Sequence, residues 1–177
     1  MQLDVVPFRP ETEAGLLAAW IAAHEWPYHG SPRPGPERVR GWIAEGRFHG
    51  PEARSFWLRA GGETAGFLAL QELGDPTPVF DLRVGGPWRR RGVGRRALTW
   101  LAERVFRVED RPRVEAHTRA DNAPMRALLR RAGWVHEAYH RQAWPDEAGR
   151  LHDACTYALL RSDWEGGTRT PIPPLDA

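Results

Sequence analysis

Residues 77–98, with the sequence TPVFDLRVGGPWRRRGVGRRAL, decide the fold. The first part, TPVFDLRV, follows a Gly-Asp-Pro turn and predicts a strand at 77–84. From residue 93 to about 107, apolar side chains recur at the spacing of a helix face. Between the two lies GGPWRRRGVG, a segment of glycines and arginines. The stretch therefore predicts a strand that leads through a cationic glycine loop into an amphipathic helix.

The start of this predicted helix is suited to bind a phosphate. The first N–H groups of a helix point outward without partners, and the helix dipole adds partial positive charge there. Gly92 and Gly94 carry no side chain, so a phosphate can approach the backbone. All 25 basic residues of the chain are arginines, and those around the two glycines can donate to phosphate through planar guanidinium groups. The alternative is a solvated, arginine-rich helix start whose glycines serve only the turn.

A dinucleotide site is the main competing interpretation of the same glycines. Residues 92–97, GVGRRA, fit the dinucleotide fingerprint, and Glu115 stands 23 residues after Gly92, where an acid would bind a ribose. However, seven residues separate the predicted strand from the fingerprint, which normally follows its strand tightly. In addition, a doubly wound fold needs several strand–helix–strand units, and one is recognisable here. These features disfavour a dinucleotide.

The rest of the chain alternates between short strands and helices. Apolar periodicity and turn residues predict strands at 3–8, 54–60, 63–72, 77–84, 112–118, 134–141 and 153–161, and helices at 11–24, 36–45, 93–107 and 122–132. This order predicts one mixed α/β or α+β domain over residues 1–164, which agrees with the chain length of 177 residues. Residues 165–177 contain three prolines and no periodicity, and we expect them to form a loosely ordered tail.

Composition and charge limit the function classes. The formal net charge of +2 gives no strong field for nucleic acid, and no stretch approaches the roughly 18 apolar residues of a membrane span. One cysteine, Cys155, cannot form an internal disulfide, and no apolar run after a basic start marks a signal peptide. No carboxylate or cysteine completes a usual metal-ligand spacing around His24 and His29. We therefore expect a cytoplasmic monomer or homodimer without metal, nucleic acid or membrane partners.

An ordered set of motifs resembles one family. Residues 89–94, RRRGVG, resemble the R/Q-x-x-G-x-G/A signature of the GNAT superfamily of acyl-CoA N-acyltransferases. The strand before it, and Asn122 followed eleven residues later by Gly133, are similar to the family's pattern on either side of the signature. Residues 153–164, DACTYALLRSDW, resemble the last strand of the branch that includes ribosomal-protein N-terminal acetyltransferases. The resemblance covers roughly residues 3–164.

The resemblance implies both a fold and an activity. The fold would be α+β (mixed α/β), a GNAT-like single domain with a central, mostly antiparallel twisted sheet of six to seven strands flanked by about four helices. The activity would be an N-acetyltransferase that moves an acetyl group from acetyl-CoA, its co-substrate, to a primary amine of a small molecule or a protein N-terminus. Transfer would occur by direct attack in a ternary complex. A CoA-binding module without turnover is the alternative, and the acceptor amine is not identified.

By this resemblance, the cofactor binds where the strand, the loop and the helices meet. The thioester oxygen gains negative charge during transfer and needs a donor, which we expect from backbone N–H groups at 82–84. Arg126 lies one helical turn after Asn122, from where its side chain could reach a phosphate of CoA. The predicted cofactor-binding residues are Leu82, Arg83, Val84, Arg89, Arg90, Arg91, Gly92, Val93, Gly94, Arg95, Asn122 and Arg126.

Direct attack needs a base for the amine and a proton donor for the thiolate. Asp81 is the first candidate base, because Asp is a poor strand former and because its place resembles that of an acid in aminoglycoside-modifying relatives. A surface ion pair with Arg83 is the structural alternative. Glu72, at the end of the neighbouring strand, is the second candidate base. Tyr157 is the candidate acid, together with Tyr139.

Two further positions bear on proton transfer, and one segment on the acceptor. Many GNAT enzymes carry a Tyr seven residues after the Asn, where this chain has Leu129, so water is an alternative proton source. His117 ends a strand close to the expected cofactor, and a structural role is expected for it, with a functional role as the alternative. Aromatic side chains gather in residues 24–43 around a proline-rich loop, where they could also pack onto the sheet. The predicted acceptor-binding residues are Trp26, Tyr28, His29 and Trp42.

Overall fold

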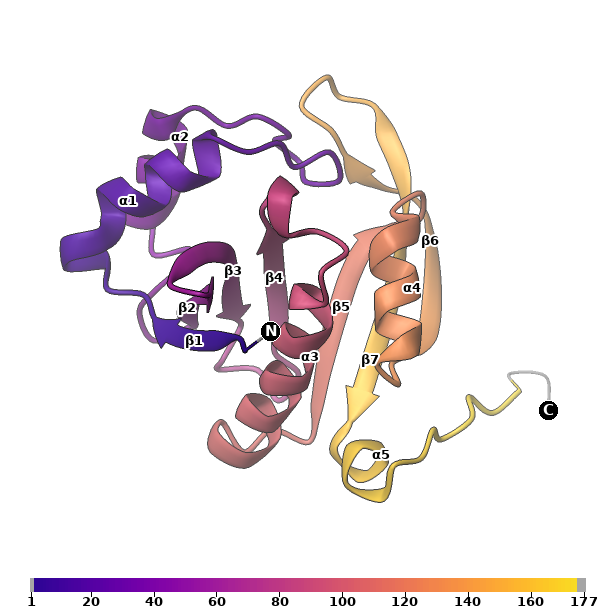
Figure 1. Ribbon diagram of the computed structural model, residues 1–177. Coiled ribbons are helices and arrows are strands. Elements are labelled where there is room, and N and C mark those ends of the chain that lie inside the picture. Colours follow the sequence, from indigo (N-terminus) through magenta and orange to yellow (C-terminus); the bar gives the residue numbers. More distant parts are fainter. Residues whose placement is uncertain (1, 175–177) are drawn as a thin grey trace.

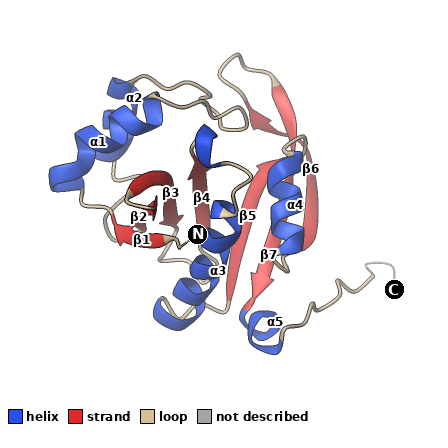
Figure 2. Cartoon of the chain, in the orientation of Figure 1, coloured by secondary structure: helices blue, strands red, loops and turns tan. Residues whose placement is uncertain are grey.

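A twisted sheet forms the centre of the protein, with helices against both of its faces (Figure 1, Figure 2). The computed structural model describes residues 2–174. Within these residues the sheet has seven strands in the order β1-β2-β3-β4-β5-β7-β6. Neighbouring strands are antiparallel except β4 and β5, which are parallel. The strands are β1 Asp4–Pro7, β2 Ala53–Ala60, β3 Glu63–Gln71, β4 Val79–Val84, β5 Arg113–Arg119, β6 Val135–Pro145 and β7 Leu151–Leu160.

The helices divide between the two faces because side chains alternate along each strand. α1 and α2 pack onto one face in a cluster that includes Trp57 and Phe67. α3 and α4 pack onto the other face, where Leu58 and Leu68 meet Leu101. Adjacent residues of β2 and β3 therefore serve two separate cores. The helices are α1 Pro10–Ala22, α2 Pro36–Ala44, α3 Val93–Glu103, α4 Ala123–Arg131 and α5 Arg161–Gly166.

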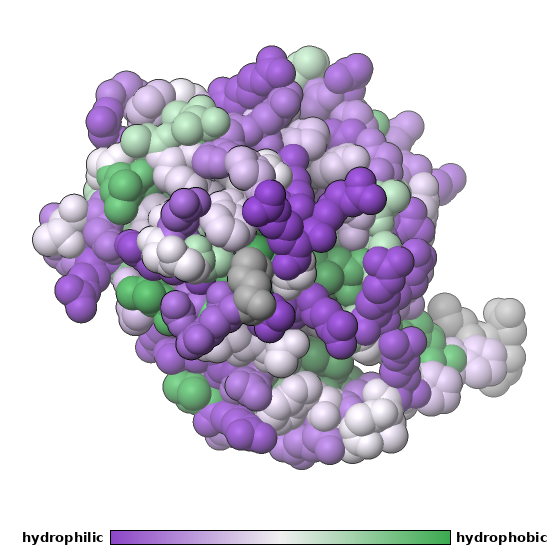
Figure 3. Space-filling view, viewed as in Figure 1, coloured by the Kyte–Doolittle hydropathy of each residue, from purple (hydrophilic) through white to green (hydrophobic). Residues whose placement is uncertain are grey.

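The outer surface is mostly polar. On the face shown in Figure 3, hydrophilic residues predominate and apolar residues form small separate patches. Large apolar side chains that are exposed, such as Leu16 and Val108, come from different elements. Among the described residues, no helix combines the length and the apolar character needed to cross a membrane.

The fold class predicted from the sequence is confirmed, including the mostly antiparallel sheet. Two element ends differ from the prediction by four residues each, and the others agree within two. The helix predicted at 93–107 is α-helical to Glu103 and continues as a π turn to Val108. β6 extends to Pro145, beyond its predicted end at 141, because register shifts after His136 and His140 interrupt the period of two in the sequence.

The sequence did not predict α5, and this helix holds part of the predicted tail. A helix of six residues is too short to show helical periodicity. The buried carboxylate of Asp163 accepts hydrogen bonds from the hydroxyl of Thr168 and from the N–H and hydroxyl of Thr170. The chain is therefore attached to the domain as far as Thr170. Residues 175–177 of the predicted tail lie outside the described residues.

The parallel strands β4 and β5 separate soon after they meet. Val79 lies opposite Glu115, and the Glu115 N–H donates to the carbonyl of Pro78 at 3.0 Å. Within residues 2–174, β4 then runs to Val84, and β5 to Arg119, without further pairing between them. The two ribbons diverge beyond this point (Figure 1). One edge of β4 is therefore free in the middle of the sheet.

The register of β4 decides which backbone groups face this opening. Gly85 donates its N–H to the carbonyl of Ala65 at 2.9 Å. Along an antiparallel strand, successive residues alternate in the side to which their N–H and C=O groups point. Asp81 and Arg83 therefore bond to β3. Leu82, between them, presents its N–H and C=O groups to the gap between β4 and β5.

β3 and β4 approach each other closely at Gly66, which lies opposite Val84. A Cβ atom on Gly66 would lie 2.5 Å from the carbonyl oxygen of Arg83 and 3.0 Å from Cδ1 of Leu58. The carbonyl belongs to the backbone, so it cannot move without displacing β4. Gly66 therefore helps to set the position of the strand that borders the opening.

We expect Gly66→Ala to lower the free energy of unfolding by about 1–3 kcal/mol, the usual cost of overpacking, because the added methyl group displaces β4. Gly41→Ala is the matched control, since an added Cβ inside α2 meets nothing within 4 Å. Alanine there should stabilise the helix by about 0.5–1 kcal/mol. Urea unfolding of both variants measures the difference. A Gly66→Ala protein as stable as the wild type would contradict the close approach.

Candidate active site

A cavity of about 430 Å³ opens where β4 and β5 separate. Side chains of β4 and β5 form one part of its wall, and the loop between α1 and α2, α2 itself and the end of β6 form much of the rest. The β6–β7 loop reaches the α1–α2 loop, where the hydroxyl of Ser31 donates to the carboxylate of Glu147 at 3.2 Å. The cavity is therefore built from segments that lie far apart in the sequence.

A buried ion cluster centred on Asp81 forms part of the wall. One carboxylate oxygen is 3.0 Å from Nε2 of His29, and the other accepts hydrogen bonds from Nε and Nη2 of Arg83 at 3.1 and 2.9 Å. The side chain of Arg83 is 1% exposed and that of Asp81 is 13% exposed. The Arg83 guanidinium also lies 5.2 Å from the ring centroid of Trp26. A buried cation is thus stabilised by one acid and one aromatic face.

The surroundings of Asp81 favour its charged form. Burial by itself would raise the pKa of this carboxyl. The interactions with Arg83 and His29 outweigh burial and hold the pKa of Asp81 well below its usual range. The carboxylate is therefore ionised and already paired near neutral pH. A group with such a low pKa is a weak general base.

The other residues predicted to transfer protons lie outside the cavity. Glu72 is exposed in the turn after β3, with a φ angle of 57°. Tyr157 is buried in the core, and its hydroxyl accepts a long hydrogen bond of 3.4 Å from Nε of Arg126. Tyr139 is exposed on β6. None of these three lines the cavity, as far as residues 2–174 define it, whereas Asp81 does.

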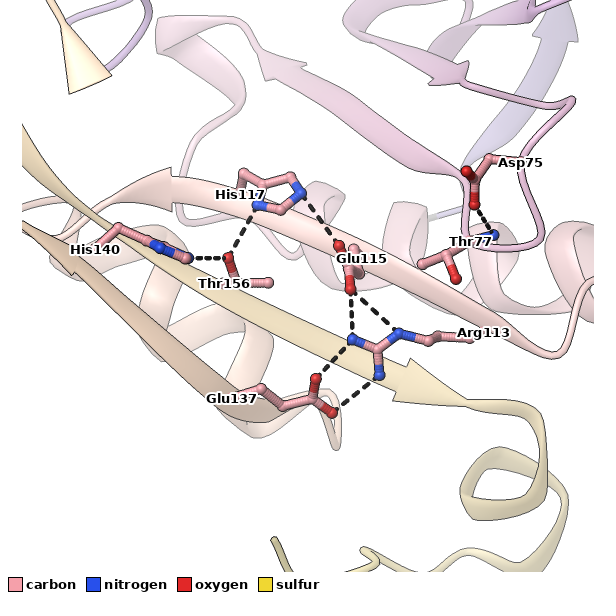
Figure 4. A network of polar contacts seen from close by, with 8 residues as sticks. All are labelled: Asp75, Thr77, Arg113, Glu115, His117, Glu137, His140 and Thr156. Carbon is pink, nitrogen blue, oxygen red and sulfur yellow. Dashed lines mark hydrogen bonds and ion pairs between the residues drawn. The ribbon is translucent and has the colours of Figure 1, made fainter. Parts of the chain in front are cut away.

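His117 lies in the cavity wall and begins a polar relay (Figure 4). Its side chain, on β5, is 44% exposed. Nδ1 of His117 is 3.0 Å from the hydroxyl of Thr156, which is 2.9 Å from Nε2 of His140 at the exposed edge strand β6. Nε2 of His117 is 3.3 Å from the carboxylate of Glu115, which is paired in turn with Arg113. One hydroxyl therefore connects a ring in the cavity to a second ring at the surface.

The residues predicted to bind the acceptor divide into two groups. Tyr28, His29 and Trp42 line the cavity. Trp26 is buried, and its indole ring packs against the guanidinium of Arg83. Trp26 therefore supports the wall from behind and does not form its surface.

The cavity is also lined by three residues that were not predicted from the sequence, Arg38, Arg47 and Trp144. Arg38 and Trp42 are four residues apart on α2, a spacing that places two side chains on one helix face. The guanidinium groups of Arg38 and Arg47 lie 5.8 and 4.8 Å from the ring centroid of Trp42. That spacing is a signal that could have identified Arg38. Trp144 has no local signal, because it reaches the cavity through the irregular end of β6.

The loop before α3 offers a row of unused backbone donors. Within residues 2–174, the N–H groups of residues 90–95 donate to no acceptor, and the first bond of the helix runs from the Arg96 N–H to the carbonyl of Gly92 at 3.1 Å. Gly92 has a φ angle of 83°, a left-handed conformation that glycine adopts readily. The arginines within this row are exposed. Consecutive N–H groups at a helix start form a concavity suited to anions, so the residues present fit a diphosphate.

Two residues of the same loop have structural partners instead. Arg89 donates from Nε to the carbonyl of Val84 at 3.0 Å and from Nη2 to the carbonyl of Glu25 at 2.7 Å. A Cβ on Gly94 would lie 2.9 Å from Cδ2 of Leu128. Arg89 therefore ties the loop to β4 and to the α1–α2 loop. Gly94 allows α3 and α4 to pack closely, a role that the sequence analysis did not give it.

Asn122 and Arg126 are also bonded within the fold. Asn122 caps α4, because its Oδ1 accepts the N–H of Met125 at 3.2 Å and its Nδ2 donates to the hydroxyl of Thr118 at 2.9 Å. It also lines the cavity. Arg126 donates from Nη1 to the carbonyl of Ala120 at 2.7 Å. The contact of Arg126 with a phosphate that the sequence suggested would compete with this bond.

The side chains of the remaining residues of the predicted cofactor site pack elsewhere in the fold. Leu82, Val84 and Val93 pack their side chains into the core on the α3 side of the sheet. Arg83 points to the opposite face, into the ion cluster. Among residues 2–174, no group of three or more His, Cys, Asp and Glu side chains is arranged to hold a metal ion.

Residues 17–134 match the sequence family described as the acetyltransferase (GNAT) family. None of the curated proteins compared with the chain matches it. Among solved structures, a chimera of the spermidine N-acetyltransferase from Vibrio cholerae has a TM-score of 0.78 at 15% identity, covering 93% of this chain and 99% of that one. A probable acetyltransferase has a TM-score of 0.73 at 17% identity, covering 92% and 94%. A dodecameric spermidine N-acetyltransferase from Vibrio cholerae has a TM-score of 0.74 at 16% identity, covering 92% and 96%. At these identities the likeness concerns the fold.

We expect Asp81→Asn to destabilise the protein by about 3–5 kcal/mol at pH 7, because it leaves the buried Arg83 without its counter-ion. The folded-state pKa of Asp81 is lowered, so the ion pair stabilises the protein above the unfolded pKa of about 3.9. This contribution is lost as the pH falls below that value. Urea unfolding is measured for wild type and variant from pH 7 downward. The difference between their free energies of unfolding should become smaller below about pH 4.

The control for this experiment is Asp121→Asn. Asp121 pairs with Arg119 at the surface, where its side chain is 56% exposed. Exposed pairs of this kind contribute about 0–1 kcal/mol. If Asp81→Asn costs no more than Asp121→Asn at pH 7, the ion cluster does not stabilise the fold in the way described.

Proposed function

Because the chain belongs to the acetyltransferase (GNAT) family, we propose that it transfers an acetyl group from acetyl-CoA to a primary amine by direct attack in a ternary complex. One observation supports the proposal most strongly. The strand β4, which borders the gap between β4 and β5, leads in sequence into the loop whose N–H groups at 90–95 have no hydrogen-bond acceptor among residues 2–174. A cavity for an acceptor and a concavity for a diphosphate thus follow one another along one segment. Acetyl-CoA would supply the thioester that is attacked.

In this proposal, backbone N–H groups bind both the diphosphate and the thioester oxygen of acetyl-CoA. The N–H groups of 90–95, with the exposed side chains of Arg90, Arg91 and Arg95, are suited to the diphosphate. The N–H of Leu82 faces the gap between β4 and β5 and is the donor for the thioester oxygen.

The base in this proposal is His117 and not Asp81. Asp81 is a weak base because of its lowered pKa. His117 is partly exposed in the cavity wall, and histidine is the side chain most often used for general acid–base catalysis. The amine proton passes to Nε2 of His117, where the carboxylate of Glu115 stabilises the charged ring. A proton then leaves from Nδ1 through the hydroxyl of Thr156 to His140.

Water is the proton donor for the leaving thiolate in this proposal. Tyr157 and Tyr139 lie outside the cavity, as residues 2–174 define it. Leu129 occupies the position where many members of the family carry a tyrosine, and it is buried in the core. Asp81 acts by holding Arg83 and His29 in the wall.

Two alternatives are tested together with the proposal. A CoA-binding module without turnover has the absence of a tyrosine at position 129 in its favour. A dinucleotide site would sit in a doubly wound parallel sheet, whereas in residues 2–174 the one parallel pair is β4 with β5. For the acceptor, residues 153–164 resemble the branch that acetylates ribosomal-protein N-termini, so an N-terminal peptide belongs in the amine panel beside small amines.

We expect thiol release from acetyl-CoA with at least one amine of that panel. The double variant Arg91→Gln/Arg95→Gln should raise the KM for acetyl-CoA at least about tenfold, because charge-assisted hydrogen bonds contribute about 1.5–3 kcal/mol each and about 1.4 kcal/mol is tenfold. Arg130→Gln, at the exposed end of α4, is the control and should leave this KM unchanged. Acetyl-CoA binding without turnover of any amine would favour the module. Tight NAD binding without acetyl-CoA binding would exclude the proposal.

We expect His117→Gln to lower kcat by about 10²–10⁴-fold, the usual contribution of a positioned acid–base group. Glu72→Gln is the control, because this carboxylate lies outside the cavity and its loss should not change kcat. The assay is thiol release at saturating acetyl-CoA. Full activity in His117→Gln, together with a hundredfold loss in folded Asp81→Asn, would return the role of base to Asp81.

A further inference from the structure

The acceptor side of the cavity carries more positive than negative charge. Its charged lining residues include three arginines, Arg38, Arg47 and Arg83, and one acid, Asp81. Asp81 is already paired with Arg83 and His29. Within residues 2–174, neither Arg38 nor Arg47 has a carboxylate within the 4.0 Å of an ion pair. Two arginines in the wall are therefore available to a ligand.

Trp42 holds these two arginines together. Both guanidinium groups lie within 6 Å of the centroid of its indole ring. Both arginines are exposed, so an anion can reach them from solvent. In addition, Nη1 of Arg83 is buried in the wall without a hydrogen-bond partner among the described residues. A buried donor of this kind is costly unless a ligand accepts its hydrogen bond.

We infer that the acceptor is a small molecule that carries an anionic group, a carboxylate or a phosphate, beside its primary amine. Arg47 and Arg38 bind the anionic group, because guanidinium forks match both kinds of anion. A polyamine would instead bring further positive charge to this wall. This inference rests on the proposed function and names the substrate class of the same site.

The rest of the wall agrees with an acceptor of limited size. Tyr28, Trp42 and Trp144 provide aromatic faces for an apolar or planar body. A volume of about 430 Å³ lies in the range of pockets for small molecules, roughly 300–1,000 Å³. The contact between Ser31 and Glu147 closes one side of the cavity. An amino acid or a similar compound fits these features better than an extended polycation.

The experiment compares matched amines by thiol release. One set is phenylalanine, its carboxamide and phenethylamine, with the same set for leucine. A second set is phosphoethanolamine and ethanolamine, and spermidine is the polycation. The anionic member of at least one set should exceed its neutral partners at least about tenfold in kcat/KM, the effect of about one charge-assisted hydrogen bond. The ratio of kcat/KM between the anionic member and its neutral partners is compared among the sets. The set with the larger ratio shows whether the site prefers a carboxylate or a phosphate. A higher kcat/KM for spermidine or for the neutral amines would overturn the inference and leave the proposed function intact.

Variants of the two arginines test the assignment directly. Arg47→Gln and Arg38→Gln should each raise the KM for the anionic acceptor about tenfold and lower, by a similar factor, the ratio of its kcat/KM to that of the neutral partner. Arg47→Lys should restore part of the affinity, because it keeps the charge but not the fork. Arg40→Gln is the matched control, since Arg40 lies on the same helix, pairs with Glu37 and is not in the cavity wall.

Equilibrium binding separates the two possible failures. The same compounds are titrated calorimetrically into the protein saturated with CoA. Binding of an anionic compound that Arg47→Gln weakens, without turnover of any amine, would support the inference and contradict the proposed function. Equal binding of anionic and neutral compounds, or no binding of any anionic compound, would overturn the inference whatever the turnover.

Discussion

The divergence of β4 and β5 after Val79 and Glu115 is the constraint on which the rest of the structure depends. Strands in the middle of a sheet normally bond to a neighbour along both edges. Here the parallel pair opens, so Leu82 keeps unused N–H and C=O groups and a cavity forms inside the sheet. The loop and the start of α3 follow β4 without interruption. One continuous segment therefore carries the backbone donors suited to a thioester and those suited to a diphosphate.

The second constraint is the buried charge of Arg83, which needs a counter-ion that only Asp81 can supply from the same strand face. Asp81 was a candidate base because it is an acid in the middle of a strand. An acid at such a position can equally be one half of a structural ion pair. The two roles conflict, because a carboxylate that neutralises a buried guanidinium does not readily accept a proton. In our proposal proton transfer is therefore assigned to the opposite wall, where His117 is open to solvent.

Local patterns predicted most of the fold and part of the candidate site. Residues 77–98 contain the change of period and the turn residues in one continuous stretch, so the strand, loop and helix could be predicted from it. The sequence could not show on which side Glu72 lies, because it follows the end of β3, where the alternation of the strand stops; it is exposed and outside the cavity. Arg47 and Trp144 were missed because their positions depend on a turn after α2 and on irregular pairing in β6. Such contacts have no local signal in the sequence.

The contact between Ser31 and Glu147 joins residues 116 positions apart. The two sides of the cavity therefore differ in how the sequence builds them. In our proposal, the side that binds acetyl-CoA is encoded by one uninterrupted stretch at the centre of the chain. The acceptor side is assembled from surface loops and a hairpin end, segments that tolerate insertion and exchange more readily than core strands. In our proposal, the loop segments 28–35 and 144–147 could therefore be replaced together to change the amine while the acetyl-CoA side is kept, which is one route by which a fold comes to serve many substrates.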